Sequence, residues 1–408
     1  MNLYETLTNR RYISQVTHEI EVKELLNNQK SHFYIGFDPT ADSLHVGHFL
    51  TLIASSILQK HGHTPIILVG GGTSMIGDPS GRSDMRKMLT KEDIQNNVSK
   101  IKKQFSRFIT FENDKAILVD NAEWLTNLNY IEFLRNYGAM FSVNRMLTAD
   151  SYKTRLEQGL TFLEFNYMIM QAYDFLELNK RYKCTLQIGG RDQWSNILAG
   201  VDLVRRVENK EVYGLTLSLL ETKSGQKMGK TAKGALWLDI EKTSAFEFYQ
   251  YFRNVDDSDV LNFLKLLTFI DDEEIKEVEN LKGSEINKAK ILLAYNVTKL
   301  VHGEDEANKA RNTAENIFIN NNFESDMPKF NIIENEVLDG IDILTLLVNS
   351  GLSKSKTEAR RLVEQKGIKI NDNVIEETDK KIKDIEIKNN QFIIQKGKKN
   401  YLKVMIDS

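Results

Sequence analysis

The chain has 408 residues, of which 41% are hydrophobic and 27% are charged, with a net charge of −3. This is the composition of a globular protein with two or three domains. Cys184 is the only cysteine, which excludes an intramolecular disulfide and argues against a cysteine-based zinc site. The N-terminal residues are polar, and no apolar run is long enough to span a membrane, so we expect a soluble, cytoplasmic protein.

Apolar, β-branched runs alternate with helical patterns over residues 1–238. This alternation predicts an α/β fold, with a Rossmann-like parallel sheet as the catalytic domain and helices on both faces. Such sheets bind ligands at the carboxyl ends of their strands, where this chain places glycines that are also typical of simple turns. The predicted strands are Phe33–Phe37, Pro65–Val69, Ala116–Val119, Thr185–Ile188 and Leu215–Leu219, and the predicted helices are Phe49–His61, Lys91–Phe108, Tyr130–Asn136, Phe162–Leu178 and Asn196–Val207.

The second half of the chain changes character twice. Residues 239–320 are helical and strand-poor, which predicts a separate helical domain, and the polar residues 321–336 read as a linker. Residues 337–408 predict a small α+β domain, with helices at Ile341–Ser350 and Lys356–Gln365 and strands at Gly367–Ile370 and Gln391–Gln395. Residues 351–408 carry a net charge of +5 against −8 for the rest, which suggests a polyanionic partner or simply a lysine-rich surface.

Two short motifs set far apart point to a phosphate site. His45-Val46-Gly47-His48 follows a predicted strand and begins a helix, so both histidines lie on one helix face beside amides that can bind an anion. Lys227-Met228-Gly229-Lys230-Thr231 places two lysines on a glycine-containing loop. Alone, the first motif is also typical of a metal site or a chance surface pair, and the second of a solvated charge run. Together they predict a site for the polyphosphate of ATP.

A third pattern lies on the predicted helix Phe162–Leu178. Tyr167, Gln171 and Asp174 are spaced four and three residues apart, so they line one face of a mainly apolar helix. A zwitterionic amino acid with a phenol hydroxyl would supply the partners that these groups need. A structural polar network between helix and sheet would explain the same spacing.

The two signatures resemble those of the class I aminoacyl-tRNA synthetases. The resemblance narrows to the bacterial-type tyrosyl-tRNA synthetases in four segments, namely residues 34–48, Gly77-Asp78-Pro79-Ser80-Gly81, residues 171–176 and residues 187–194. It extends over nearly the whole chain. It implies a tyrosine–tRNA ligase with L-tyrosine, ATP and tRNA(Tyr) as partners. It also implies a homodimer, Mg²⁺ that accompanies ATP without a dedicated protein metal site, and no prosthetic group.

The resemblance also implies roles for individual residues. It implies that Tyr167, Gln171 and Asp78 hold the ammonium of tyrosine, Tyr34 and Asp174 its phenol, and Gln193 its carboxylate. The implied ATP-binding residues are Gly36, Asp38, Thr40, His45, His48, Thr51, Asp192, Lys227 and Lys230. The implied catalytic residues, which position the substrates and stabilise the leaving pyrophosphate, are Thr40, His45, His48, Arg82, Arg86, Lys227, Lys230 and Thr231. No general base for transfer to tRNA can be named.

The sequence departs from the family pattern at two positions. Gly229 stands where the family signature has serine, and Arg191 stands where a small residue is expected beside Asp192. The segment 351–371 resembles an S-four-like RNA-binding module, and the helical domain before it would face the anticodon side of the tRNA. In this module a basic cluster suits contact with the RNA backbone, and it consists of Lys354, Lys356, Arg360 and Arg361.

Three other functions compete with this reading. A tryptophanyl-tRNA synthetase would not need Tyr34 and Asp174 to match a phenol, and a small-molecule nucleotidylyltransferase would not need the helical and basic domains. An RNA-binding or splicing accessory protein with a decayed catalytic half would have lost signature residues such as His45, Asp78 or Lys230, and all of these are present.

Overall fold

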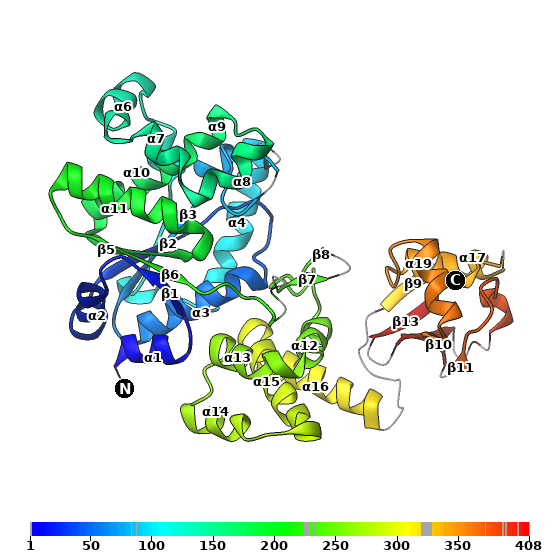
Figure 1. The fold of residues 1–408 in the computed structure, drawn as a ribbon. Coiled ribbons are helices and arrows are strands. Elements are labelled where there is room, and N and C mark those ends of the chain that lie inside the picture. Colours follow the sequence, from blue (N-terminus) through cyan, green and yellow to red (C-terminus); the bar gives the residue numbers. More distant parts are fainter. Residues whose placement is uncertain are drawn as a thin grey trace. The chain divides into compact units, whose positions relative to one another are not determined.

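The computed structural model describes residues 2–407 except 83, 87, 224, 226, 227, 232, 233, 320–328, 339, 372, 386, 388, 389, 398 and 399. The chain divides into two compact units. The first comprises Met1–Met228 with Lys265–Phe269, and the second comprises Gly229–Leu264 with Ile270–Ser408 (Figure 1). Along the chain, the division between Met228 and Gly229 lies within the predicted lysine-containing signature.

A six-stranded sheet forms the centre of the first unit, in the order β1-β6-β5-β2-β3-β4. All neighbours are parallel except β1, which pairs antiparallel with β6. All five predicted strands are present, so the prediction of an α/β fold with a parallel sheet is confirmed, and β1 was not predicted. The strands are β1 Ile13–Val16, β2 His32–Phe37, β3 Thr64–Val69, β4 Ile117–Asp120, β5 Cys184–Gly190 and β6 Tyr213–Leu217.

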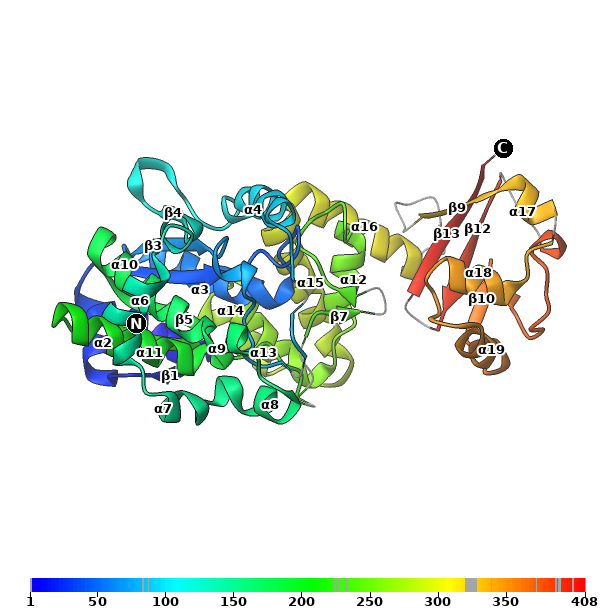
Figure 2. The same cartoon turned by 90° about the horizontal axis from the view of Figure 1, so that it is seen from above.

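The two faces of the sheet carry different helices. Tyr34 packs in one hydrophobic cluster with Phe175 of α10 (Tyr167–Tyr182), and α11 (Trp194–Glu208) runs beside α10 (Figure 2). Phe37, which is three residues further along β2 and therefore points to the other face, contacts Phe105 of α4 (Lys91–Phe105) and His48 of α3 (Val46–Lys60). The phenol-matching residues and the paired histidines thus approach the end of β2 from opposite faces.

The predicted helix Phe162–Leu178 is wrong in one respect, because it is two helices. Thr161 and Glu164 form a capping box that begins α9 (Phe162–Phe165), and α10 begins at Tyr167 after the single residue Asn166. The other helical elements of this unit are α1 Leu3–Asn9, α2 Glu19–Asn28, η1 Thr73–Met75, η2 Glu112–Asp114, α5 Ala122–Leu125, α6 Tyr130–Asn136, η3 Gly138–Met140, α7 Val143–Leu147, α8 Asp150–Gln158 and η4 Arg191–Gln193.

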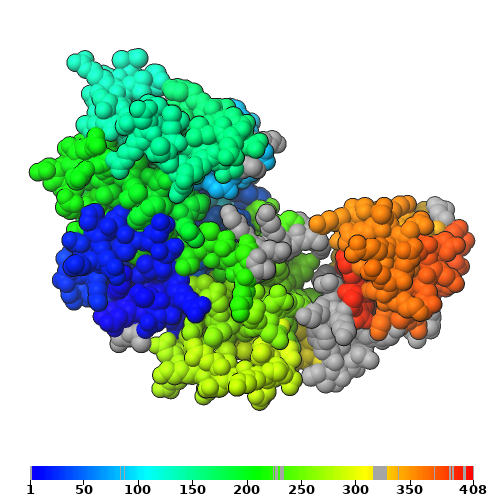
Figure 3. Space-filling model, in the orientation of Figure 1, coloured from blue at the N-terminus to red at the C-terminus, as the bar shows by residue number. Residues whose placement is uncertain are grey.

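Large apolar side chains are exposed on one part of this unit. Residues 130–162 form a continuous stretch of its surface, turquoise to sea green in Figure 3, and in this stretch Ile131 and Phe162 are each 70% exposed. Tyr130, Val143, Leu147 and Leu156 in the same stretch are also exposed. Exposed large apolar side chains, where they cluster, mark interaction sites.

The second unit contains a helical region and a separate small sheet. The helical region consists of the hairpin β7 Lys230–Thr231 and β8 Gly234–Ala235, then α12 Ala245–Arg253, α13 Asp257–Leu267, α14 Asp272–Glu279, η5 Gly283–Glu285, α15 Ile286–His302 and α16 Glu304–Ile319. Among the residues that the structure describes, no helix is both long and apolar enough to cross a bilayer.

The C-terminal part folds as a five-stranded sheet, in the order β11-β10-β12-β13-β9, with its own apolar core. Residues 329–333, which were predicted to belong to the linker, form β9 and pair in parallel with β13. The linker prediction therefore extends too far toward the C-terminus. The elements are β9 Lys329–Ile333, α17 Glu334–Leu338, α18 Ile343–Asn349, α19 Lys356–Glu364, β10 Ile368–Ile370, β11 Asn373–Val374, η6 Ile382–Asp384, β12 Gln391–Lys396 and β13 Asn400–Asp407.

Candidate active site

Gly36 opens a space at the carboxyl end of β2. It is exposed, and a Cβ atom added to it would meet only Leu68 Cδ2, at 3.7 Å. The other strand-end glycines are close-packed instead, because an added Cβ would lie 2.0 Å from Asp38 Oδ1 at Gly70 and 2.3 Å from Asp120 Oδ1 at Gly71. Of these three glycines, Gly36 alone would accept a side chain without a close contact. Tyr34 and Asp38 stand on either side of it along the chain.

Asp174 of α10 is 2% exposed. Its Oδ1 accepts a hydrogen bond from Trp124 Nε1 at 2.8 Å, and its Oδ2 accepts one from Asn121 Nδ2 at 2.9 Å. Burial raises the pKa of Asp174 to about 8, although these two hydrogen bonds oppose the shift. The carboxyl group is therefore held in position by donors while its charge is poorly solvated.

Two buried polar atoms near Asp174 have no partner among the described residues. One is the Tyr34 hydroxyl, and the other is Gln187 Oε1. Tyr34 and Gln187 are register partners in the parallel pair β2–β5, so their side chains share a face of the sheet. Burial, and then the charge of Asp174, raise the pKa of Tyr34 well above its usual value. Buried polar groups are normally hydrogen-bonded, so a polar ligand at this place would find two groups available to it.

Asp38 connects the helix α10 to the end of β2. Its Oδ2 accepts a hydrogen bond from the Tyr167 hydroxyl at 2.8 Å, and its Oδ1 accepts one from Thr73 Oγ1 at 2.7 Å. Thr73 Oγ1 in turn accepts from Asn121 Nδ2 at 3.1 Å, so a polar chain runs from Asp38 to Asp174. Burial raises the pKa of Asp38 and of Tyr167. Asp38, predicted to bind ATP, is thus hydrogen-bonded to Tyr167, which is predicted to bind the ammonium of tyrosine.

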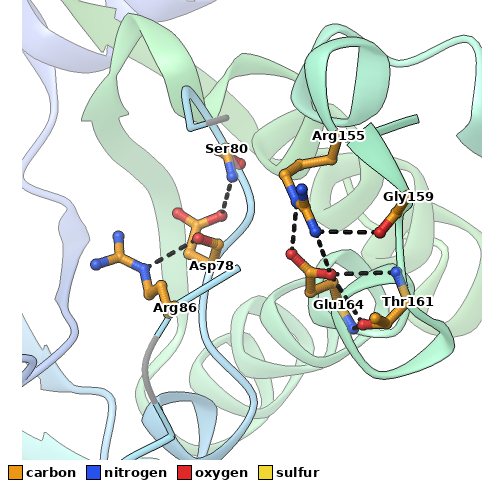
Figure 4. Close-up of polar contacts among 7 residues, drawn as sticks. All are labelled: Asp78, Ser80, Arg86, Arg155, Gly159, Thr161 and Glu164. Carbon is orange, nitrogen blue, oxygen red and sulfur yellow. Dashed lines mark hydrogen bonds and ion pairs between the residues drawn. The ribbon is translucent and has the colours of Figure 1, made fainter. Parts of the chain in front are cut away.

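A second polar group surrounds Asp78. Its Oδ2 accepts from Gln193 Nε2 at 2.7 Å, and its Oδ1 accepts from the backbone amide of Ser80 at 2.8 Å (Figure 4). The buried Asn196 Nδ2 donates to Gln193 Oε1 at 3.2 Å and to Gln171 Oε1 at 3.1 Å. Burial raises the pKa of Asp78 to about 6 despite the hydrogen bonds from Ser80. Asp38 raises it further, so these two carboxylates repel each other, and a bound cation would relieve that repulsion.

The His-x-Gly-His motif forms the start of α3. The two imidazole rings stack with centroids 3.9 Å apart, which confirms that His45 and His48 lie on one face. The prediction that first-turn amides are free for an anion is corrected, because Gly47 N donates to His45 Nδ1 at 3.0 Å and His45 N donates to His48 Nδ1 at 3.3 Å. Burial lowers the pKa of both histidines. They therefore present neutral ring N–H groups rather than positive charge.

Other predicted nucleotide residues lie around these elements. Thr40 and Asp192 are exposed, and Thr51 is half-buried on α3. Arg86 Nε donates to the carbonyl oxygen of Asp78 at 3.0 Å (Figure 4), while Arg82 is exposed on the same loop. Arg191, whose role was left open, is also exposed.

The second signature is only partly described. Lys227 and the side chains of Lys230 and Thr231 lie outside the described part of the chain. Gly229 has φ +89°, a conformation that strains a serine, and its amide donates to the Tyr251 hydroxyl at 2.9 Å. Glycine at this position therefore matches the backbone geometry of the loop.

Three residues of the site were missed by sequence analysis. Asn121 and Trp124 follow the predicted strand Ala116–Val119 without a recognisable motif, and Asn196 lies at the start of a predicted helix, also without one. All three act by holding other side chains of the site, and such contacts arise from tertiary packing.

In the C-terminal part, the four predicted RNA-binding residues Lys354, Lys356, Arg360 and Arg361 are exposed at the start and along one flank of α19. Lys356 Nζ lies 3.9 Å from Asp342 Oδ2, which offsets part of its charge. Lys356 and Arg360 are one turn apart on α19, so they lie on one face of that helix.

A parallel sheet with a His-x-Gly-His turn after its first parallel strand, followed by a helical region, defines a class I aminoacyl-tRNA synthetase. The family model for tRNA synthetases class I (W and Y) matches residues 26–319. A model for the C-terminal domain of tyrosine–tRNA ligases, of the SYY-like type, matches residues 319–404.

Relatives narrow the class further. The tyrosine–tRNA ligase of Acetivibrio thermocellus is 57% identical over 405 residues, covering 99% of each chain, and that of Clostridium tetani is 55% identical over 406 residues, covering 100% of this chain and 99% of the other. A truncated mitochondrial tyrosyl-tRNA synthetase from Aspergillus nidulans superposes with a TM-score of 0.70 at 30% identity, covering 78% of this chain and 94% of that one. The chain belongs to the tyrosine–tRNA ligases.

Proposed function

We propose that the space between Tyr34, Gly36 and Asp174 receives the side chain of L-tyrosine, and that ATP binds beside it over the start of α3. The observation that carries this proposal is the buried Tyr34 hydroxyl, which has no partner among the described residues. The charge of Asp174 also raises the pKa of this hydroxyl, so the two groups interact. A phenol hydroxyl placed between them can donate to Asp174 and accept from Tyr34, so it satisfies both groups at once.

The ammonium of tyrosine is proposed to lie among Asp78, Tyr167 and Gln171. Asp38 and Asp78 supply negative charge here, and the raised pKa of both carboxyls means that a cation stabilises their ionised forms. Gln193, which donates to Asp78, is proposed to turn toward the tyrosine carboxylate. That carboxylate is the nucleophile, so its position decides whether it meets the α-phosphorus of ATP in line.

In the first reaction, an oxygen of the tyrosine carboxylate forms a bond to the α-phosphorus of ATP and the bond to pyrophosphate breaks. Thr40 and His45 are proposed to contact the terminal phosphate, and His48, Thr51 and Asp192 the ribose. Neutral histidines donate hydrogen bonds without adding charge. The positive charge for the leaving pyrophosphate is proposed to come from Arg82, Arg86, Lys227 and Lys230, with Thr231 beside them.

We propose that Mg²⁺ binds together with ATP and is not held by a dedicated set of protein ligands. The carboxylate oxygens of Asp38 and Asp78 already accept hydrogen bonds from Tyr167, Thr73, Gln193 and Ser80. Phosphate oxygens and water therefore fit as the ligands of the metal, which would neutralise charge on the β- and γ-phosphates.

The second reaction is the transfer of tyrosine to the terminal adenosine of tRNA(Tyr). We propose that residues 239–319 face the anticodon side of the tRNA and that the basic surface of α19 contacts its phosphate backbone. We also propose that the enzyme works in the cytoplasm as a homodimer. The exposed apolar residues between positions 130 and 162 support a second copy of the chain as the partner of this surface.

Tyr34→Phe tests the tyrosine pocket directly. The hydroxyl has no partner to lose among the described residues, so the melting temperature should not fall below the wild-type value. The KM for tyrosine in ATP–pyrophosphate exchange should rise by about two- to tenfold, the effect of one neutral hydrogen bond. The preference for tyrosine over phenylalanine should fall by a similar factor. Unchanged preference in a folded variant would exclude Tyr34 from the phenol site.

A further inference from the structure

A buried ion pair outside the proposed pocket joins α8 to α9. Arg155 Nε donates to Glu164 Oε1 at 2.8 Å and Arg155 Nη2 donates to Glu164 Oε2 at 3.1 Å, with side-chain exposures of 6% and 2% (Figure 4). Arg155 Nη2 also donates to the carbonyl oxygen of Gly159 at 3.1 Å, and Glu164 Oε2 accepts from Thr161 N and Oγ1 at 3.1 and 2.9 Å. The carboxylate thus caps α9 while it binds the guanidinium on α8.

A second contact fixes the same two helices. Tyr152, one turn before Arg155 on α8, is fully buried, and its hydroxyl donates to the carbonyl oxygen of Phe165 at 2.7 Å. The rings of Tyr152 and Phe165 lie 5.3 Å apart. α8 therefore holds two successive residues of α9, Glu164 and Phe165, while Gly159 with φ +100° closes the turn between the helices.

The held residues adjoin the proposed tyrosine-binding helix. α9 ends at Phe165 and α10 begins at Tyr167. Only Asn166 therefore separates Phe165, which α8 holds, from Tyr167, which donates to Asp38. Asn166 remains hydrogen-bonded into α9 through the carbonyl oxygens of Phe162 and Leu163. A shift of α9 would therefore move Tyr167, and Gln171 one turn later, by a similar amount.

The pair also faces the loop that carries Asp78 and the basic residues. Hydrogen bonding to Glu164, together with the charges of Glu164 and then Asp84, raises the pKa of the Arg155 guanidinium. Asp84 belongs to the loop between Arg82 and Arg86. Tyr152 lies close enough to Asp78 for that carboxylate to contribute to its raised pKa, after burial. Charged groups of this loop, Asp84 and Asp78, therefore interact electrostatically with Arg155 and Tyr152 of α8.

A buried ion pair is weak evidence for a stability role, because desolvation of both charges opposes their attraction. Its two-pronged geometry does define the relative position of two helices more closely than apolar contacts do. We propose that Arg155 and Glu164 are positioning residues, which act through α9 to place Tyr167 and Gln171 against the ammonium of tyrosine. This inference rests on the proposed function.

The test is made on the full-length enzyme with Arg155→Met combined with Glu164→Gln. This double variant removes both charges together, so neither is left buried alone, and glutamine keeps the capping box of α9. The matched control is Lys153→Met with Asp150→Asn, which removes an ion pair of 2.5 Å on the same helix whose side chains are 67% and 80% exposed.

Equilibrium dialysis with labelled tyrosine, without ATP, should give a dissociation constant at least about tenfold higher for the double variant than for the wild type. The KM for ATP should stay unchanged, and the control should match the wild type in both. Wild-type affinity for tyrosine in the folded double variant would overturn the positioning role alone. Loss of tyrosine and ATP binding in proportion would also overturn it. A wild type that binds no tyrosine would overturn the proposed function as well.

If the double variant does not fold, Tyr152→Phe gives the same measurement. It removes the hydrogen bond to the carbonyl oxygen of Phe165 and the backbone hydrogen bond with Met168, and it keeps the ring contact with Phe165. It should weaken tyrosine binding and leave the KM for ATP unchanged, and unchanged tyrosine binding would overturn the proposal.

Discussion

Asp174→Asn is expected to weaken the binding of tyrosine without changing the KM for ATP. The carboxylate accepts from two donors, Trp124 Nε1 and Asn121 Nδ2, at 2.8 and 2.9 Å. Asparagine offers one acceptor oxygen and one NH₂ group, so one of the two donors must then face another donor. The variant should therefore lose about 1–3 kcal/mol of stability, the cost of one unsatisfied buried group.

The effect on tyrosine follows from the charge of the acceptor. A hydrogen bond to a charged group contributes about 1.5–3 kcal/mol, so the affinity for tyrosine should fall by about 10- to 150-fold. The KM for ATP should not change, because the paired histidines approach β2 from the opposite face of the sheet. The affinity of the variant for phenylalanine should equal that of the wild type, so the ratio of the affinities for tyrosine and phenylalanine should fall.

The assay is ATP–pyrophosphate exchange at pH 8.5, above the raised pKa of about 8, so that most of the wild-type carboxyl is ionised. Asp150→Asn, at a side chain that is 80% exposed on α8, is the control for a lost surface charge. Unchanged KM for tyrosine in a folded Asp174→Asn variant would refute the phenol assignment. An equal loss for tyrosine and ATP would show that the residue supports the fold and not the tyrosine pocket.

Three further predictions concern other parts of the chain. Gly36→Val should fold normally, because an added Cβ meets only Leu68 at 3.7 Å, yet it should abolish measurable tyrosine binding; binding at the wild-type level would show that the space is not the pocket. A second prediction concerns the dependence of stability on pH. The folded chain keeps a proton on Asp174 up to about pH 8, whereas the unfolded chain releases it near pH 4. The free energy of unfolding of the wild type should therefore decrease as the pH rises from about 4 to about 8. The difference in melting temperature between the wild type and Asp174→Asn should therefore shrink from pH 5 to pH 8, and a growing difference would contradict the raised pKa. Lys354→Ala combined with Arg360→Ala should reduce tRNA charging at physiological salt and leave pyrophosphate exchange unchanged, whereas equal loss of both activities would place these residues in support of the catalytic unit.

The parallel strands could be predicted because strands buried on both faces are nearly continuous apolar runs. β1 could not, since Ile13–Val16 is a four-residue edge strand with two polar residues. The break between α9 and α10 was hidden because Asn166 keeps helical dihedral angles, so the apolar periodicity runs through it. β9 pairs with β13 about seventy residues further along the chain, and local composition carries no signal for such a partner.

For the candidate site, spacing was enough to place Tyr167, Gln171 and Asp174 on one helix face and to bring His45 against His48. The supporting residues could not be found in this way. Asn121 and Trp124 follow β4 and reach Asp174 only because β4 and α10 meet in the folded unit. The buried pair of Arg155 and Glu164 was missed for the same reason, since charged residues nine positions apart normally suggest two exposed surface groups.

The measurement that tests the central claim most directly is ATP–pyrophosphate exchange by the full-length protein without tRNA, run in parallel with each of the standard amino acids. Exchange that depends on tyrosine alone is the predicted result. It would establish the adenylate reaction and the substrate together. Exchange with tryptophan instead would overturn the assignment of Tyr34 and Asp174, and no exchange with any amino acid would contradict the proposed active site.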